Sequence, residues 1–207
     1  MKKSITLIAL VTLLFLGVSG GSTHAKTIST LRRIETTYNA SKKAVTFSGT
    51  VSSKKTTRVT LVYNNGKKTV VNVKKGAFKV AKKFRGYKTF SLYGTNKKSQ
   101  RTTRVYKLTS AKYATATPTI LKIDHSAKNG TVVVNVKAPK QSQIQIYNAK
   151  KNIANVKSNG KTQTLKLKSY KGKTIHFRLN AKQRHLKTSK DVYTPKIKQG
   201  IIYQVSY

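Results

Sequence analysis

The acidic side chains are too few and too scattered to form an acid–base catalytic centre. Only three of the 207 residues are carboxylic acids, namely Glu35, Asp124 and Asp191. Glycoside hydrolysis, for example, needs two carboxyl groups within roughly 5–10 Å of each other. Glu35 and Asp124 occupy matching places in the two halves of an internal repeat, so we do not expect them to share a site. We expect each acid to pair with neighbouring lysines or to cap a turn, and we predict no catalytic residue.

Histidine, serine and cysteine patterns add no catalytic or metal-binding candidate. The four histidines are His24, His125, His176 and His185. Nothing in their spacing predicts convergence on a zinc ion, and His176, between two apolar residues, should face solvent if the segment is a strand. The chain has no cysteine, which excludes disulfides and thiolate chemistry. Nucleophile-elbow, P-loop and dinucleotide-binding motifs are also missing, so we predict a non-enzymatic protein without metal or cofactor.

The strongest chemical signal is positive charge. The chain carries 44 Lys and Arg residues against three acids, for a formal net charge of +41. Such an excess attracts polyanions, and the predominance of Lys over Arg favours diffuse point-charge contacts over bidentate phosphate binding. The predicted polyanion-binding residues, most of them in predicted turns, are Lys67, Lys68, Lys74, Lys75, Lys82, Lys83, Arg85, Lys97, Lys98, Lys150, Lys151, Lys171, Lys173 and Arg184.

Two alternatives to a dedicated polyanion site stay open. In the first, the basic clusters are only a solvated surface without a binding role. Tyr87 and Tyr170, which flank the basic turns, have the type of side chain that stacks on sugars or bases. Burial at the edge of a β-sandwich explains the same two tyrosines equally well.

Short segments in which apolar and polar residues alternate predict the elements that position these side chains. Residues 44–51, 57–63, 89–94 and 131–137 show this period of two, which is typical of half-buried strands. Beyond the N-terminal apolar run, no stretch keeps a helical period of 3.6 residues. Several short strands at spacings of roughly 8–12 residues predict an all-β sandwich or barrel.

The segment 63–80 carries two predicted turns separated by a short strand. Asn65-Gly66 fits a two-residue type I′ hairpin turn, whose central residues both need positive φ. Lys74-Lys75-Gly76 supplies the second turn. Elsewhere we expect a first strand at 31–35, a loop at 36–43 and an additional edge strand within 201–207.

The same pattern recurs in the second half of the chain, which indicates one β-unit used twice. The matching landmarks, offset by 83–89 positions, are Arg33-Ile34-Glu35 with Lys122-Ile123-Asp124, Tyr63-Asn64 with Tyr147-Asn148, Asn72-Val73-Lys74 with Asn155-Val156-Lys157, Gly76 with Gly160, and Val105-Tyr106 with Val192-Tyr193. Residues 109–119 lack apolar alternation and contain Pro118, so we read them as the linker. The predicted domains are therefore 26–112 and 113–207.

Residues 1–25 have the pattern of a secretory signal peptide. A basic start precedes an apolar run at 5–18, and Thr23-His24-Ala25 offers a small-residue cleavage site. The run is shorter than the roughly 20 residues that span a bilayer, which favours cleavage over an uncleaved anchor. Without a sorting motif or a second apolar tail, we expect a secreted protein, extracellular or non-covalently held at the cell surface. Membrane contact is then confined to export.

Four segments together resemble the bacterial immunoglobulin-like domains. They are V-T-F-S-G-T-V at 45–51, R-V-T-L-V-Y at 58–63, G-A-F-K-V at 76–80 and K-T-F-S-L-Y-G at 88–94. These domains occur in tandem in secreted and surface proteins of Gram-positive bacteria. The resemblance implies two immunoglobulin-like β-sandwich domains with a structural, adhesive or spacer role and no shared catalytic residue. Lysines stand where many such modules carry acids, so calcium binding is not expected.

Three functions fit these observations. The first is electrostatic binding to an anionic cell-wall polymer such as teichoic acid, or to an acidic glycan. The second is non-specific binding of extracellular nucleic acid, which counterion release makes available to any polycation. The third is membrane-active antimicrobial action, which ordinarily needs an amphipathic helix that the sequence does not show.

Overall fold

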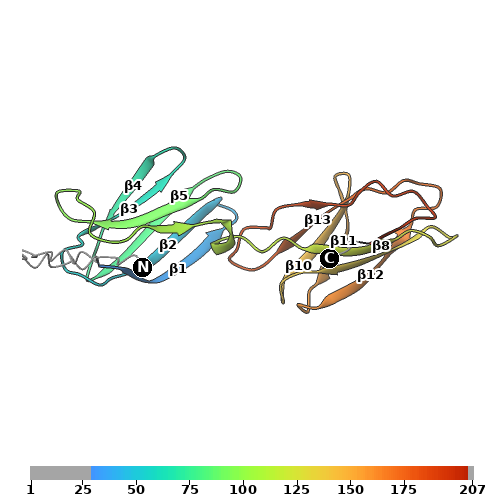
Figure 1. Cartoon of the computed structure of the whole chain (residues 1–207), viewed down its shortest axis with the longest axis horizontal. Helices are drawn as coiled ribbons and strands as arrows, with labels where there is room; N and C mark the ends of the chain where they lie inside the picture. Colours follow the sequence, from blue (N-terminus) through green and yellow to red (C-terminus); the bar gives the residue numbers. More distant parts are fainter. Residues whose placement is uncertain (1–28, 205–207) are drawn as a thin grey trace, which may run out of the picture.

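The computed structural model describes residues 29–204, which fold into two β-sandwiches lying end to end (Figure 1). In the first unit a three-stranded sheet of order β1-β2-β5 faces a four-stranded sheet of order β4-β3-β6-β7. The strands are β1 (Leu31–Asn39), β2 (Ala44–Val51), β3 (Arg58–Tyr63), β4 (Lys67–Asn72), β5 (Ala77–Lys83), β6 (Phe90–Thr95) and β7 (Tyr106–Leu108). Seven antiparallel strands in two layers make an immunoglobulin-like sandwich, which confirms the predicted fold class.

The second unit repeats this plan and adds one strand. Its sheets have the orders β12-β9-β8-β15 and β11-β10-β13-β14. The strands are β8 (Thr119–Asp124), β9 (Thr131–Lys137), β10 (Gln143–Asn148), β11 (Lys151–Lys157), β12 (Thr162–Ser169), β13 (Phe177–Lys182), β14 (Val192–Tyr193) and β15 (Ile202–Gln204). The added β15 pairs antiparallel with β8 at the sheet edge, which confirms the edge strand predicted within 201–207.

Each unit encloses a hydrophobic core of its own, built by alternate strand residues. The first core is aromatic at its centre, where Phe47 and Tyr113 pack against Phe90 with ring centroids 5.3 and 5.7 Å apart. The second core is mainly aliphatic and buries Val134 and Ile146 completely. Because apolar residues fill the inward positions, the intervening lysines of strands such as β5 and β12 face solvent.

Two predicted turns fold differently in detail. Tyr63 pairs with Lys67, so the β3–β4 connection has three residues, Asn64, Asn65 and Gly66, all with positive φ. The predicted two-residue turn at Asn65-Gly66 is therefore wrong. A two-residue turn with positive φ at both positions occurs instead at Lys75-Gly76, where Lys74 and Ala77 exchange two backbone hydrogen bonds of 2.9 Å.

Strand boundaries differ at two other places. β1 continues to Asn39, so the first half of the loop predicted at 36–43 is strand, because Thr36 to Asn39 pair with β2. The last strand of the first unit, for which alternation at 103–108 predicts six residues, is shorter and starts at Tyr106. The preceding residues 96–105 form a long loop instead.

The segment predicted as a linker contributes to the first core. It contains the 3₁₀ turn η1 (Ser110–Lys112), after which Tyr113 is fully buried among residues of the first unit. The Tyr113 hydroxyl accepts a hydrogen bond from the Lys88 N–H at 2.6 Å and donates one to the Lys88 carbonyl at 2.7 Å. Tyr113 therefore anchors the beginning of the segment that connects the two units to the first unit. The domain boundary between residues 112 and 113 stays a prediction.

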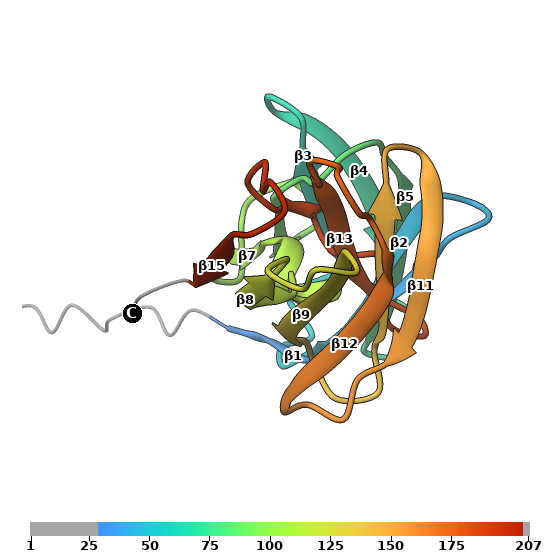
Figure 2. The same ribbon diagram turned by 90° about the vertical axis from the view of Figure 1, so that its right-hand side faces the viewer.

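The two ends of each sandwich carry different loops. We call "head" the end that holds the β2–β3 and β6–β7 loops of the first unit and the β9–β10 and β13–β14 loops of the second. The opposite end is the "tail". The tail of the first unit meets the head of the second, and Figure 2 views the pair along its long axis from the second unit.

No helix in residues 29–204 is long and apolar enough to cross a membrane. The predicted signal peptide, 1–25, lies outside the described residues.

Candidate functional site

The predicted polyanion-binding residues lie on the surface but do not form one site. All of them are exposed except Lys82, which is half-buried. Lys74, Lys75, Lys97 and Lys98 lie at the head of the first unit, whereas Lys67, Lys68, Lys83 and Arg85 lie toward its tail. Lys150, Lys151, Lys171 and Lys173 lie at the tail of the second unit, and Arg184 lies in its head loop.

Lys82 is engaged with an aromatic ring. Its Nζ lies 4.2 Å from the ring centroid of Tyr63. The Lys82 side chain, followed by the Thr69 hydroxyl, lowers the pKa of Tyr63 from its ordinary value. Lys82, predicted as a binding residue, therefore also makes a cation–aromatic contact within the first unit.

A large hollow lies at the head of the first unit, and we call it the head hollow. Its volume is about 860 Å³. It is lined by Ser29, Ser53, Lys55, Thr57, Asn96, Lys97, Lys98, Gln100, Arg101, Thr102 and Thr103. Every lining side chain is polar: four are cationic, five carry hydroxyls and two carry amides. None of these described lining residues is a carboxylate, so they give the hollow a positive charge without compensation among themselves.

The loop that carries three of these cations is held in place by hydrogen bonds. The Asn96 side chain accepts from the Gln100 N–H at 3.0 Å and donates to the Gln100 side-chain oxygen at 2.9 Å. The Asn96 N–H donates to the Gln100 carbonyl at 3.0 Å, and Ser99 takes a positive φ of 60° to close the turn. Lys97 and Lys98 are thus presented from a fixed loop.

Hydroxyl groups fix the base of the same loop. The Thr56 and Thr102 hydroxyls share a hydrogen bond of 2.8 Å, and the Ser29 hydroxyl donates to the Thr102 carbonyl at 2.8 Å. The Gly94 N–H donates to the Thr103 hydroxyl at 2.7 Å. Thr57 differs, because its hydroxyl oxygen is buried without a hydrogen-bond partner within the described part of the chain.

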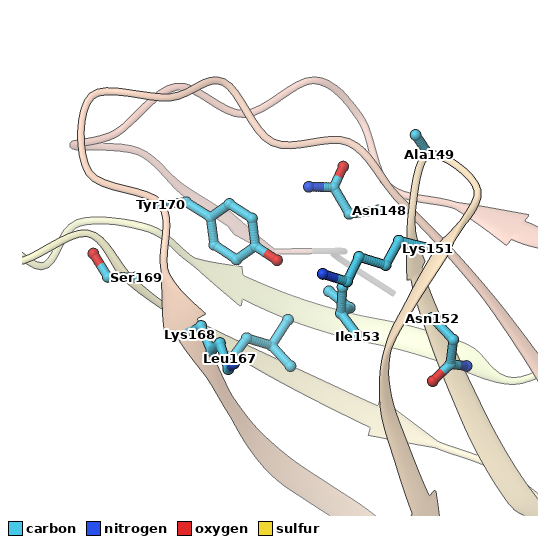
Figure 3. Close-up of a pocket in the computed structure, with 9 residues that line it drawn as sticks. All are labelled: Asn148, Ala149, Lys151, Asn152, Ile153, Leu167, Lys168, Ser169 and Tyr170. Atoms are coloured by element: carbon cyan, nitrogen blue, oxygen red, sulfur yellow. The ribbon is translucent and has the colours of Figure 1, made fainter.

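A second hollow, of about 450 Å³, lies at the tail of the second unit (Figure 3). The Tyr170 ring and the Lys151 side chain point toward each other across it, above Ile153 and Leu167. Tyr170 also packs edge-on against the core residue Phe177, with centroids 5.4 Å apart. Its ring is therefore partly a core side chain, as the burial alternative expected.

Beside this hollow, the surface formed by β10, β13 and β14 carries two contacts that involve aromatic rings. His176 stacks on Tyr193 with centroids 5.8 Å apart, and Tyr193 is 57% exposed. Arg178 lies 4.1 Å from the ring centroid of Tyr147. The exposure expected for His176 is confirmed.

The carboxylates do not gather. Asp124 forms an ion pair with Lys122 at 3.5 Å and accepts hydrogen bonds from the Ser126 hydroxyl and the Ser126 N–H. The two hydrogen bonds from Ser126 are the main reason why the pKa of Asp124 is lowered. Asp191 pairs with Arg178 at 3.2 Å and accepts from Asn180. Glu35 is exposed on β1 and has no ion pair within the described residues.

The described residues contain no group of three or more potential metal ligands. His125 is completely buried, and neither ring nitrogen has a hydrogen-bond partner in the described chain.

Lys55 and Arg101 also line the head hollow, although neither is among the predicted polyanion-binding residues. Both were visible in the sequence as basic residues near predicted turns. Successive antiparallel strands run in opposite directions, so the turns after β2 and β6 lie at the same end of the sandwich. Counting the predicted strands could therefore have placed Lys55 and Arg101 at the same end of the first unit.

Comparison with known proteins finds no matching family model and no matching curated protein. Among solved structures, the chain is similar to one titled "Biofilm associated protein - BSP domain", at 13% identity and a TM-score of 0.31, over 82% of this chain and 30% of that chain. It is also similar to a chimeric titin Z1Z2-Z1Z2 tandem, at 13% identity and a TM-score of 0.29, over 78% and 95% of the two chains. Both scores are low, so the fold assignment rests on the strands, sheets and cores described above.

Proposed function

We propose that this chain is a secreted, non-enzymatic protein that binds anionic polymers, namely teichoic acid or acidic glycans, through its cationic surface. The observation that carries the proposal is the near absence of compensating acids: the net charge is +41, and nearly all of the predicted binding cations are exposed. Adhesion to anionic material at a cell surface is the role this binding would serve.

Many weak contacts, spread over two units, suit an extended polymer. At physiological salt the screening length is about 8 Å, so each cation acts mainly on the polymer charges nearest to it. Each polymer charge that is neutralised releases a counterion, which makes affinity fall steeply with salt. Rigid strands hold the lysines apart, so the protein has no large reorganisation to undergo on binding.

The test is binding of the purified protein to Gram-positive cell wall with and without teichoic acid. We expect binding to intact wall at about 0.15 M salt, a large loss after teichoic acid is removed, and release near 1 M salt, where the screening length falls to about 3 Å. Equal binding to both walls, or full retention at 1 M salt, would contradict the proposal. Single-stranded DNA, added at the same phosphate concentration as the wall polymer, serves as a competitor. If the DNA displaces the wall polymer completely from the protein, nucleic acid becomes the preferred partner.

A further inference from the structure

The same end of the two sandwiches is used in two different ways. In the second unit the head is covered by the first unit. Lys187, from the β13–β14 loop, places its Nζ 5.3 Å from the Tyr38 ring centroid and 5.2 Å from that of Tyr87. The Tyr38 N–H donates to the His185 carbonyl at 2.7 Å. This loop is therefore occupied by an intramolecular contact.

The corresponding loop of the first unit, 96–105, carries the cations of the head hollow. The two loops are structural equivalents. In each unit a hydroxyl group of the loop accepts a hydrogen bond from the second-last residue of the preceding strand: the Thr103 hydroxyl accepts from the Gly94 N–H, and the Ser189 hydroxyl accepts from the Ala181 N–H. In each unit a residue that precedes the first strand also forms a parallel bridge to this loop, Ser29 to Thr103 and Ala114 to Lys187. The end that contacts the neighbouring unit in the second sandwich is, among the described residues, an uncovered cationic hollow in the first.

The lining of the hollow specifies the chemistry of its occupant. Four cations, with no carboxylate among the described lining residues, favour a ligand with negative charge, and the hydrogen-bonded loop holds three of them, Lys97, Lys98 and Arg101, near one another despite their mutual repulsion. Most hydroxyl and amide groups of the lining are hydrogen-bonded within the protein, but the Ser53 hydroxyl, which accepts from the Lys55 N–H at 3.2 Å, keeps its own proton to donate beside the charges. The described lining residues include no aromatic ring, whereas sites for single-stranded nucleic acid usually stack bases on such rings.

The geometry points to the head hollow as a dedicated site for a phosphodiester group in a polyol-phosphate chain. This inference rests on the proposed function and assigns it a place. Lys55, Lys97, Lys98 and Arg101 bind the phosphate oxygens. The Ser53 hydroxyl donates to a polyol oxygen beside the phosphate. A volume of about 860 Å³ falls within the range of roughly 300–1,000 Å³ that is typical of sites for small ligands.

The experiment compares two variants of the purified protein with equal charge. One carries Lys55→Gln, Lys97→Gln, Lys98→Gln and Arg101→Gln. The control carries Lys79→Gln, Lys107→Gln, Lys137→Gln and Lys166→Gln, which are exposed lysines on strands away from the hollow. The probes are a glycerol-phosphate oligomer, single-stranded DNA and a sulfated saccharide, each matched in charge, at about 0.15 M salt.

We expect the hollow variant to lose about tenfold or more in affinity for the glycerol-phosphate oligomer, while the control loses no more than about threefold, because localised charged hydrogen bonds exceed diffuse attraction. On DNA and the sulfated saccharide the two variants should lose affinity equally. Equal losses on the glycerol-phosphate oligomer would overturn the site and leave the general polyanion binding intact. Failure of the unmodified protein to bind any of the three probes would overturn the proposed function itself.

A titration observed by NMR supplies a measurement that does not depend on the variants folding. Addition of the glycerol-phosphate oligomer should shift amide signals mainly in residues 53–57 and 96–103. Shifts spread evenly over both units, or centred on residues 148–153 of the second hollow, would also overturn the assignment.

Discussion

Lys187 of the second unit lies against Tyr87 of the first, with its Nζ 5.2 Å from the ring centroid. The Tyr87 hydroxyl donates to the carbonyl of the adjacent residue, Thr188, at 2.7 Å, and burial is the main reason why the pKa of Tyr87 is raised. The same ammonium group also lies near Tyr38 and Phe84. A half-buried cation among three rings therefore joins the two sandwiches.

Replacing Lys187 by methionine should loosen this junction. Methionine keeps an apolar side chain of similar length and removes the charge, so we expect a loss of about 1–2 kcal/mol, which is typical of a partly desolvated cation–aromatic contact. Small-angle scattering of the full chain should then show a broader distribution of interatomic distances. Lys166→Met, at an exposed lysine of β12 in the second unit, is the control. Identical scattering for both variants would mean that the hydrogen bonds, including that of the Tyr87 hydroxyl, hold the junction without the Lys187 charge.

Two glycines at the tail of the second unit provide a matched test of a close approach. Gly130 and Gly172 have similar positive φ values of 73° and 69°. A Cβ at Gly130 would lie 2.2 Å from the Lys171 backbone nitrogen, whereas a Cβ at Gly172 would meet nothing within 4 Å. Both Ala variants suffer about 1–2 kcal/mol of backbone strain, and Gly130→Ala adds about 1–3 kcal/mol of overpacking. Denaturant unfolding measures the difference; equal stabilities of the two variants would contradict it.

Tyr113 should stabilise the first unit although it follows the predicted boundary. Tyr113→Phe leaves the N–H and carbonyl of Lys88 without the hydroxyl that joins them, at a cost of about 1–3 kcal/mol. A fragment covering 26–112 should accordingly melt at a lower temperature than one covering 26–116, since only the longer one contains this buried ring. Calorimetry of the two fragments checks this, and equal melting temperatures would place Tyr113 outside the folded first unit.

Asp124 should contribute to the acid sensitivity of the second unit. Its pKa is lowered by the Ser126 hydroxyl, then by the Ser126 N–H, and further by Lys122. A carboxyl group whose folded pKa lies below its unfolded value of about 3.9 stabilises the fold above that pH, and the stabilisation is lost as the pH falls through the folded pKa. Asp124→Asn should therefore flatten the decline in unfolding free energy below about pH 4. Glu35→Gln, which removes an exposed acid from β1, is the control; parallel profiles for wild type and Asp124→Asn would refute the assignment.

Local pattern was sufficient for most strands and for the duplication. Val45 and Phe47 alternate with polar residues, and both are buried in β2 as that alternation requires. The turn at 64–66 was less predictable, because Asn64 and Asn65 both tolerate positive φ and the choice between a two-residue and a three-residue turn depends on strand pairing. The length of β1 was missed because its later residues are held by pairing with β2 and show little apolar signal.

The sequence by itself determined a doubled β-sandwich with lysines on its outward positions, because alternation with period two is read directly from neighbouring residues. Only the tertiary structure decided which cations meet. Lys55 and Arg101 line one hollow although they are far apart along the chain, and Lys187, an ordinary basic residue in the sequence, lies among the aromatic rings of the other unit. The reason is physical: burial is encoded locally by each strand, whereas the convergence of loops depends on how antiparallel strands and whole units are joined.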